Sequence, residues 1–457
     1  MMKPCNSTIK RALVGILLLS GAALFPLDLP VRQIEDDSAI RAAVKDAWLL
    51  ETPARVIRNR PFSRSLPGGS PVQVRAETRG NEITVILARE WNGTFPGWAQ
   101  GSWVLTRFMD GAYERIRIFL HSDPYTYIQF RPMENAGDGG DPANGKSLLD
   151  VVLYEAYVVR GLPLGFPMES LLTMPLNDIF DALGDKFPRR YFDPDPDMYR
   201  DTRELAGKVR AGLAKLKFAD DGAIDENGRY VFINTLSPQN TSGGPEDGTA
   251  RGGLNCSGFT KWFVDGLLYP VSGRLLPITP LKEASSKKSS SLAENYAAIR
   301  DPAFGLDWTR NLAMEAARVL RSPGTSALED VEVRGGTFAA VIDRRGGRAA
   351  VKSYPAFLPG AGFSMEGLRP LLYTLAVNEP GYVYLASVNT ETGPVPRMRQ
   401  HYHEAVFFPY FNEYGVFQTA VFESAVETSL NAFIARYPGQ MVNLVRVPVE
   451  ARFTAQP

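Results

Sequence analysis

Few residues of this chain could act as a thiol nucleophile or an imidazole base, because it has only two cysteines and three histidines. Cys256 is the cysteine placed for chemistry. It follows the Gly-rich segment Gly252-Gly253-Leu254-Asn255 and begins an apolar helical pattern, Ser257–Leu267. The free N–H groups and the macrodipole at a helix start stabilise a thiolate. The alternative is a structural cysteine packed as a small hydrophobe. The position makes Cys256 a candidate nucleophile.

A thiol nucleophile needs an imidazole to take its proton and a third group to orient that imidazole. His121 lies in a β-like N-terminal region, and we expect it to be a structural or surface residue. His401 and His403 stand at the entry to an apolar strand predicted over Glu404–Tyr410, where a side chain stays accessible. Each could instead be an ordinary surface residue. Because residues two apart on a strand share a face, His401 is a rival to His403.

The strand after His403 predicts a partner for it. Glu404–Tyr410 and Val416–Ser424 have the pattern of a hairpin in which Tyr410 pairs with Val416. That register sets Glu423 directly opposite His403, and opposed residues project from the same face. We therefore expect Glu423 to accept a hydrogen bond from His403, whereas a one-residue slip would separate them.

These segments together resemble a known family. Asn255-Cys256-Ser257-Gly258-Phe259 is similar to the Asp-Cys-Ser-Gly-aliphatic signature of the NlpC-like cell-wall cysteine peptidases, which have a papain-like fold. Pro380–Leu385 resembles the segment that precedes the family's catalytic histidine, and His403–Phe408 resembles the strand that the histidine opens. Val421–Ser424 lies where the family has its third polar residue.

The resemblance implies Cys256 as nucleophile, His403 as base and acid, and Glu423 as the orienting residue. It leaves a possible oxyanion or supporting role for three further residues, which are Tyr230, Asn255 and His401. The chain departs from the family pattern by Asn255 in place of the Asp and by the long separation of Cys256 and His403, which implies an insertion at about 275–375. The implied fold class is α+β, with a papain-like NlpC-type catalytic domain.

Composition narrows the other possibilities. Lys+Arg 50 balances Asp+Glu 50, so bulk charge does not suggest a nucleic-acid partner. With so few His and Cys residues, a zinc site built from them is improbable, and we expect neither a metal nor a cofactor. A length of 457 residues indicates two or three domains.

The domain organisation is predicted from changes in composition along the chain. Residues 1–25 have a basic start, an apolar core and small residues in the order of a signal peptide, with an uncleaved membrane anchor as the alternative. Residues 30–135 are expected to form a small β-rich domain, a sandwich or barrel, ended by the Gly/Asp-rich stretch 135–146. Residues 147–455 would hold the catalytic domain, with predicted helices over Leu148–Val159 and Met168–Leu183.

The expected function is that of an exported cysteine hydrolase of the periplasm or cell envelope, a peptidoglycan endopeptidase that cleaves stem-peptide amide bonds through an acyl-enzyme. One alternative is an acyltransferase or amidase that acts on another exported substrate. Another is a catalytically degenerate wall-binding protein, whose thiol would keep the pKa of an ordinary cysteine. The expected partner is peptidoglycan or a peptide, with at most an N-terminal anchor in the membrane.

Overall fold

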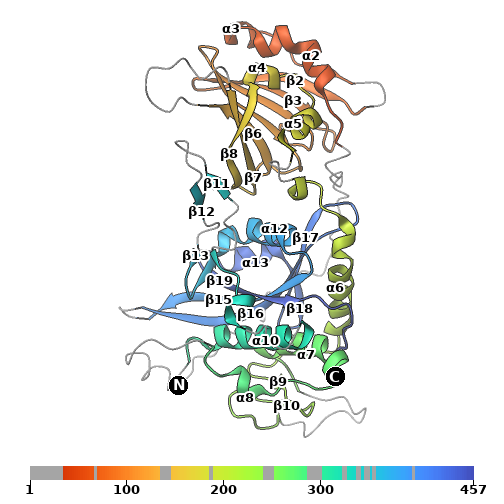
Figure 1. Cartoon of the computed structure of the whole chain (residues 1–457), viewed down its shortest axis with the longest axis vertical. Coiled ribbons are helices and arrows are strands. Elements are labelled where there is room, and N and C mark those ends of the chain that lie inside the picture. The colour runs from red at the N-terminus through yellow and green to blue at the C-terminus, as the bar shows by residue number, and fades with distance from the viewer. Residues whose placement is uncertain are drawn as a thin grey trace.

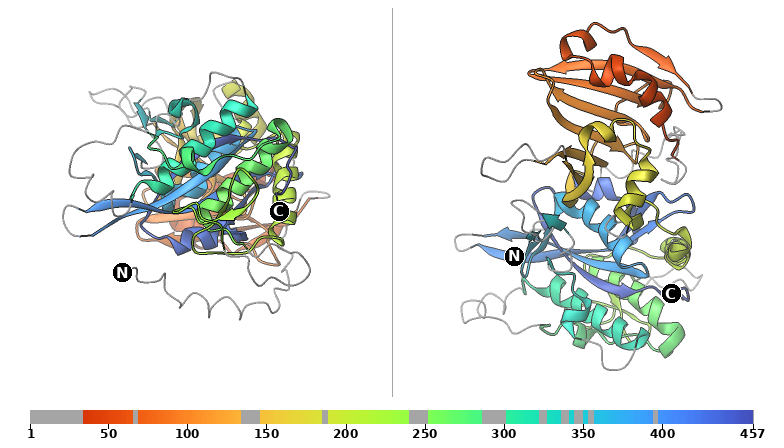
Figure 2. Two further views of the ribbon diagram at one scale, coloured as in Figure 1. Left: turned by 90° about the horizontal axis from the view of Figure 1, so that it is seen from below. Right: turned by 45° about the horizontal axis from the view of Figure 1, so that its top comes forward.

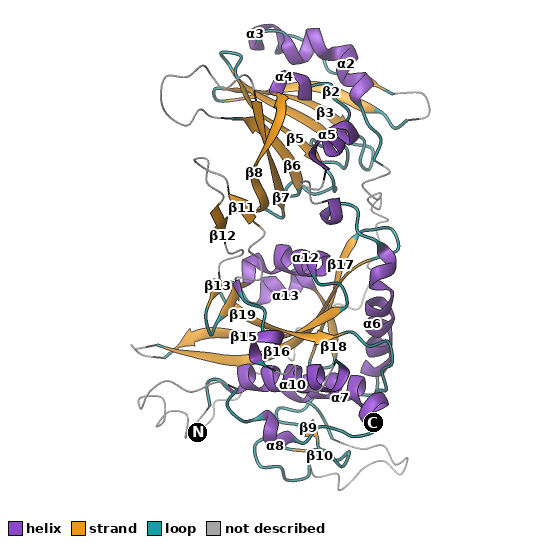
Figure 3. Ribbon diagram, viewed as in Figure 1, coloured by secondary structure: helices purple, strands orange, loops and turns teal. Residues whose placement is uncertain are grey.

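The computed structural model shows a mixed α/β chain built on antiparallel sheets (Figures 1 and 3). The structure describes residues 34–65, 69–133, 146–184, 189–239, 252–285, 301–321, 327–335, 341–343, 350–352, 357–393 and 397–456. The predicted signal segment 1–25, with Cys5, lies outside the described residues. No helix in the described ranges is long and apolar enough to cross a bilayer.

The N-terminal domain is an antiparallel meander in which each strand pairs with the next along the chain. The meander strands are β1 (Phe62–Arg64), β2 (Val72–Arg79), β3 (Glu82–Arg89), β4 (Trp103–Phe108), β5 (Tyr113–Phe119), β6 (Tyr127–Pro132), β7 (Lys146–Leu153) and β8 (Ala156–Pro167). Helical segments α2 (Ser38–Val44), η2 (Lys45–Leu50), α3 (Pro53–Val56), α4 (Met168–Leu171) and α5 (Leu176–Leu183) accompany the sheet. The β-rich character of this domain was predicted.

Two predictions about its C-terminal limit are wrong. Leu148–Val159 is not a helix, because it forms most of β7, a turn and the start of β8. Tyr154 and Glu155 join these strands with φ of 48° and 70°, the left-handed pair of a tight hairpin turn. The stretch 135–146 is also not a domain boundary, since it connects β6 to β7 within one sheet. The N-terminal domain therefore continues past residue 135 through α5.

The C-terminal domain is built on a seven-stranded sheet of order β13-β14-β19-β15-β16-β17-β18. Its strands are β13 (Phe357–Leu358), β14 (Gly362–Ser364), β15 (Tyr382–Thr392), β16 (Met398–Phe411), β17 (Phe417–Glu423), β18 (Val426–Ser429) and β19 (Met441–Pro448). A small hairpin of β9 (Ala223–Ile224) and β10 (Tyr230–Val231) lies beside it. The β16 and β17 segments lie where the sequence predicted strands.

Helices cover both faces of this sheet (Figure 2). On one face α7 (Cys256–Ser272) and α10 (Phe304–Leu320) pack on the side chains of Val406 and Phe408. On the other face α12 (Leu368–Asn378) and α13 (Leu430–Arg436) pack on Ala405 and Phe407. Because both faces are buried, β16 is apolar without interruption over Ala405–Phe408 and does not show a simple alternation of polar and apolar residues there.

The two domains share a hydrophobic cluster at α12. Tyr373 of α12 is fully buried among N-terminal residues, and its hydroxyl donates to the Tyr191 carbonyl. Tyr199 donates to the Ala376 carbonyl at 3.0 Å. His121, expected to be structural or at the surface, is buried with its ring 6.4 Å from that of Tyr373.

The remaining segments link these layers. The connection from β8 carries η5 (Arg189–Tyr191), η6 (Pro196–Tyr199) and α6 (Arg200–Leu213). The chain between α7 and β15, predicted as an insertion, carries α8 (Ile278–Leu281), α10, α11 (Leu328–Val331), β11 (Val341–Asp343), β12 (Ala350–Lys352), β13, β14, η9 (Met365–Gly367) and α12. Of these, β11 pairs in parallel with β8, so this segment extends the N-terminal sheet.

Candidate functional site

The start of α7 is fixed by side-chain capping and close backbone packing. Asn255 is the N-cap residue, and its side-chain oxygen accepts from the Gly258 N–H at 2.8 Å, the geometry expected of an Asn cap. A Cβ at Gly258 would collide with the Gly222 backbone, so only glycine fits there. Asn255, proposed above as a supporting residue, therefore positions the helix that begins at Cys256.

Large buried side chains hold α7 against the sheet and α10. Trp308 of α10 donates its indole N–H to the Ser257 carbonyl at 2.9 Å. Phe263 meets the edge of Phe408 from β16, with ring centroids 5.5 Å apart. The predicted apolar face of this helix is confirmed as core, and the first turn of α7 is rigidly placed over β16.

The residue of β16 that faces the thiol is Glu404. Its carboxylate lies against Cys256 and accepts a hydrogen bond from the Ser257 hydroxyl at 2.9 Å. Glu404 is 1% exposed, whereas Cys256 is half-buried and borders the surface. Glycine at position 305, in the first turn of α10, leaves room for the carboxylate, which a Cβ there would strike. The site is thus a thiol and a buried carboxylate at a helix N-terminus.

The electrostatics of this pair differ from those of a thiolate–imidazolium pair. Burial raises the pKa of the Cys256 thiol well above its ordinary value, and the negative charge of Glu404 raises it further. Burial also raises the pKa of Glu404, against the opposing hydrogen bonds from Cys256 and Ser257. Each group therefore disfavours the negative charge of the other, so the thiol and the carboxyl do not ionise together at the helix start.

His403 does not face Cys256. It lies on the opposite face of β16 from Glu404, where its ring stacks at 5.5 Å from that of Tyr437. Successive side chains of a strand point to opposite faces, so His403 shares its face with Ala405 and Phe407 under α13. The arrangement implied by the resemblance, with His403 beside the thiol, is not the one that the structure holds.

The expected contact between His403 and Glu423 is nevertheless present. Nε2 of His403 donates to the Glu423 carboxylate at 2.7 Å, and Arg436 pairs with the other carboxylate oxygen. Burial acts to raise the pKa of Glu423, but the hydrogen bond and charge of His403 and the charge of Arg436 outweigh it and lower that pKa. The hairpin pairs Tyr410 with Gln418, two residues from the predicted register. A slip of two preserves the face, which is why the two side chains still meet.

His401 lies on the same face as Glu404, because a β-bulge interrupts the alternation. Val388 pairs with His403 and Asn389 with His401, so Tyr402 is the extra residue. Nδ1 of His401 lies 3.0 Å from the Ser387 hydroxyl and Nε2 lies 3.2 Å from the Gly360 carbonyl. A carbonyl only accepts, so Nε2 carries the proton and Nδ1 accepts from Ser387. The expectation that the two histidines share a face is wrong.

His401 is not placed as a proton acceptor for the thiol. Burial lowers the pKa of His401 to about 4, so its ring is neutral at neutral pH and is a poor base. Tyr230 is buried in β10 and its ring packs directly on the backbone of Gly252, four residues before Cys256. The contact of Tyr230 is with the loop that leads into α7. His401 and His403 therefore make their hydrogen bonds with groups other than the thiol.

Glu404 and Ser387 are the functional candidates that the sequence analysis missed. The sequence held a signal for Glu404. This residue directly precedes the apolar run Ala405–Phe408, and a carboxylate in a buried strand usually has a functional or structural partner. Ser387 carried no such signal. Its hydroxyl is fully buried beside Gly305, between His401 and Glu404, only because β15 pairs Ser387 with Glu404.

Comparison with known proteins finds a family match in the N-terminal part of the chain. Residues 30–191 match the family described as Domain of unknown function (DUF8515). The matched range agrees with the N-terminal domain and ends in η5, well beyond the boundary predicted at 135. No curated protein and no solved structure matches the chain.

Proposed function

We propose that this chain is an exported cysteine hydrolase of amide bonds in which Glu404, and not a histidine, takes the proton of Cys256. The observation that carries the proposal is the partly exposed thiol at the start of α7 with a buried carboxylate against it. The resemblance of residues 255–259 to the NlpC-like signature supports peptidoglycan stem peptides as the substrate class and the cell envelope as the location.

The raised pKa of Glu404 suits a general base. Enzymes use burial to tune a carboxyl group upward, which makes its carboxylate a stronger proton acceptor near neutral pH. Direct transfer of the thiol proton to Glu404 keeps one negative charge at the helix start, whereas loss of that proton to solvent would create two. Catalysis by this pair therefore depends on proton transfer as the sulfur attacks and does not need a resting thiolate.

The proposed reaction is an acyl transfer that passes through a thioester on Cys256. The Cys256 sulfur bonds to the amide carbon while Glu404 receives the thiol proton. The N–H groups of Cys256 and Ser257 are the donors offered to the oxyanion, because those of Gly258 and Phe259 already bond to Asn255. Glu404 then gives the proton to the departing amine, which leaves a thioester. Water attacks the thioester as Glu404 again accepts a proton. Glu404 then returns this proton to the departing Cys256 sulfur, which releases the acid product and regenerates the thiol.

The supporting residues hold the carboxylate in place. Ser257 donates to Glu404 at 2.9 Å, and Trp308 fixes the Ser257 backbone through its carbonyl. Ser387 and His401 form a neutral hydrogen-bonded pair beside Gly305 on the same face of the sheet. The hydrogen bond from Ser257 orients Glu404 toward the thiol without adding a second charge.

One observation favours a second function, the degenerate wall-binding protein. The pKa of the thiol is raised, which is the property of an unreactive cysteine. Intact-mass analysis after incubation with purified wall peptides and acid quenching separates the two. The hydrolase should show an adduct of the acyl fragment in the wild type and none in Cys256→Ala. A wild type that forms neither adduct nor product, but still sediments with wall material, would support the binding protein.

A further inference from the structure

Exposed arginines and apolar side chains occur together at one end of the molecule. Residues 53–64 contain α3, the turn after it and β1, which is the edge strand of the N-terminal sheet. Figure 1 shows α3 at the end of the long axis opposite to α7. Pro53 and Val56 form the buried face of α3, whereas Ile57 and Arg58, which follow, are exposed. All of β1 is exposed as well.

Five exposed residues form the arginine surface, which consists of Ile57, Arg58, Arg60, Phe62 and Arg64. Among the described residues, none of its three guanidinium groups has an ion pair or a side-chain hydrogen bond. Ile57 is 44% exposed and Phe62 is 37% exposed, so two large apolar side chains accompany the unpaired charges. This unpaired positive charge contrasts with the balanced charge of the whole chain.

The two parts of the arginine surface are adjacent because both pack on η2. Asn59 donates its side-chain N–H to the Ala47 carbonyl at 2.8 Å. The ring of Phe62 lies 5.8 Å from the ring of Trp48, which is also in η2. Phe62 and Arg64 are two residues apart on a strand, so they project from the same face of β1. The charged and apolar groups are therefore presented side by side.

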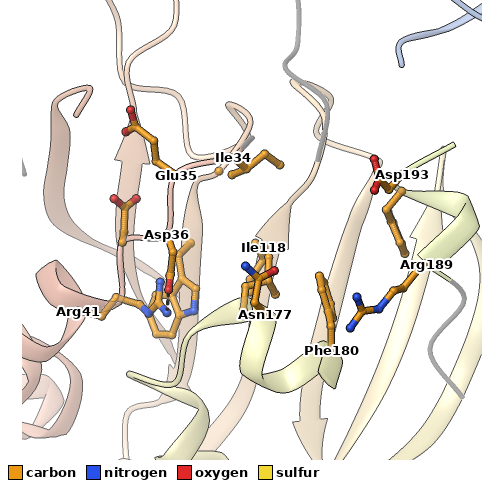
Figure 4. Close-up of a pocket in the computed structure, with 14 residues that line it drawn as sticks. Ile34, Glu35, Asp36, Arg41, Ile118, Asn177, Phe180, Arg189 and Asp193 are labelled. Carbon is orange, nitrogen blue, oxygen red and sulfur yellow. Dashed lines mark hydrogen bonds and ion pairs between the residues drawn. The ribbon is translucent and has the colours of Figure 1, made fainter. Parts of the chain in front are cut away.

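The helical arm that carries this surface is fixed to the rest of the domain. Arg41 of α2 donates to the Leu172 carbonyl at 3.1 Å and to Asp36 at 3.2 Å, and Figure 4 shows Arg41 on the same side as Asp36. After η2, Arg107 of β4 donates to the Glu51 carbonyl at 2.8 Å. The arm is thus held before and after η2, and the arginine surface is already formed before any partner binds.

We infer that the arginine surface binds the surface of an anionic phospholipid bilayer. The three guanidinium groups would donate to lipid phosphate oxygens, which a guanidinium can bind with two parallel hydrogen bonds. Ile57 and Phe62 would enter the boundary between the head groups and the acyl chains, as the apolar residues of membrane-surface helices do. An acidic polysaccharide or a nucleic acid would engage the arginines but would leave these two apolar side chains without a role.

The order of segments along the chain supports a membrane partner. The apolar stretch Ala12–Phe25, predicted as a signal peptide or membrane anchor, precedes the domain that carries the arginine surface. A chain that keeps this stretch in a membrane holds this domain next to the lipid. With the arginine surface on the bilayer, α7 and Cys256 would lie at the end of the molecule away from it (Figure 1). The inference does not depend on the proposed hydrolase function.

The test is the partition of the full-length protein onto vesicles, measured by sedimentation over a lipid titration. The vesicles contain phosphatidylcholine alone or phosphatidylcholine mixed with phosphatidylglycerol. The triple variant Arg58→Gln, Arg60→Gln, Arg64→Gln should lower the partition coefficient on the anionic vesicles roughly tenfold or more and leave that on the neutral vesicles unchanged. Residues 1–25 are the same in every variant, so their contribution cancels.

The matched control removes three exposed arginines from the C-terminal domain, through Arg274→Gln, Arg397→Gln and Arg452→Gln. It makes the same change in net charge and should bind the anionic vesicles as the wild type does. Agreement between the two triple variants would show that only net charge matters and would overturn the inference. Equal binding of the wild type and the Arg58, Arg60 and Arg64 variant would overturn it as well.

Ile57→Ser separates a membrane from an acidic polymer as the partner. This exposed side chain should be replaceable without a change in melting temperature, and its loss should weaken binding to the anionic vesicles severalfold. If Ile57→Ser binds these vesicles as tightly as the wild type, the apolar contacts are absent and the bilayer is the wrong partner. Tighter binding of the wild type to heparin than to the vesicles, with Ile57→Ser unaffected, would assign the surface to an acidic polymer.

Discussion

The charge of Glu404 should control the reactivity of Cys256, and Glu404→Gln tests this directly. Glutamine keeps the shape of the side chain and can still accept from Ser257, but it removes the negative charge beside the thiol. A carboxylate that raises the pKa of a thiol lowers the thiolate fraction at every pH below that pKa. The variant should therefore react faster with a neutral electrophile.

The magnitude follows from the charge–charge energy. At a contact distance of ~4 Å and an effective dielectric constant of ~20, two charges interact by about 4 kcal/mol. Cys256 is only half-buried, so solvent screening reduces this to about 2 kcal/mol. Since 1.36 kcal/mol corresponds to one pKa unit, we expect a fall of ~1.5 units in the thiol pKa and a roughly 30-fold faster alkylation near pH 7.5.

The assay is alkylation by iodoacetamide followed by intact mass, in a Cys5→Ser background so that one thiol remains. Iodoacetamide is neutral, so the substitution does not change its attraction to the site. Glu423→Gln removes a carboxylate from the other face of the sheet and should leave the rate unchanged. An unchanged or slower rate in Glu404→Gln would refute the placement of a charged Glu404 beside the thiol.

Three further results are expected. Gly305→Ala should displace the Glu404 carboxylate, which a Cβ would strike, and should lower both the melting temperature and hydrolysis. Lys261→Met should cost about 3–5 kcal/mol in chemical denaturation, because the buried charge of Asp265, 2.6 Å from Lys261, loses its partner. The pKa of Glu423 is lowered in the fold. The contribution of Glu423 to stability is therefore complete above the unfolded pKa of ~4.3 and is lost as the pH falls through the folded pKa. Glu423→Gln should flatten the fall in stability between about pH 5 and 2.

Local sequence signals predicted the elements around the site well. The Gly-rich segment before Cys256 and the apolar spacing after it placed the start of α7, and the hairpin of β16 and β17 was expected from two apolar runs around a turn. The contact of His403 with Glu423 also followed, because the error in register was an even number of residues.

Local sequence signals did not predict which face of β16 meets α7. Both faces of this strand are buried, so apolar residues occur at even and odd positions, and alternation does not show which face meets α7. The bulge at Tyr402 then sends His401 and His403 to opposite faces, and a bulge has no reliable signature in a single sequence. The choice of His403 over Glu404 rested on residue type, whereas packing decides which side chain reaches the thiol.

The helix predicted over Leu148–Val159 failed for a related reason. An apolar run of this length fits a buried strand or a helix equally well. Two positive φ angles at Tyr154 and Glu155 make the hairpin, although neither residue type strongly favours that conformation. Pairing with β6 supplied the preference for strand that the local sequence lacked.

The most direct measurement is amide hydrolysis of purified wall peptides by wild type, Cys256→Ala, Glu404→Gln and His403→Ala at equal concentration, with folding checked by circular dichroism. If Glu404 is the base, Cys256→Ala and Glu404→Gln should each lose at least 10²-fold in kcat, whereas His403→Ala should keep its rate within a few-fold. Loss of activity in His403→Ala with retention in Glu404→Gln would contradict the assignment of Glu404 as the base.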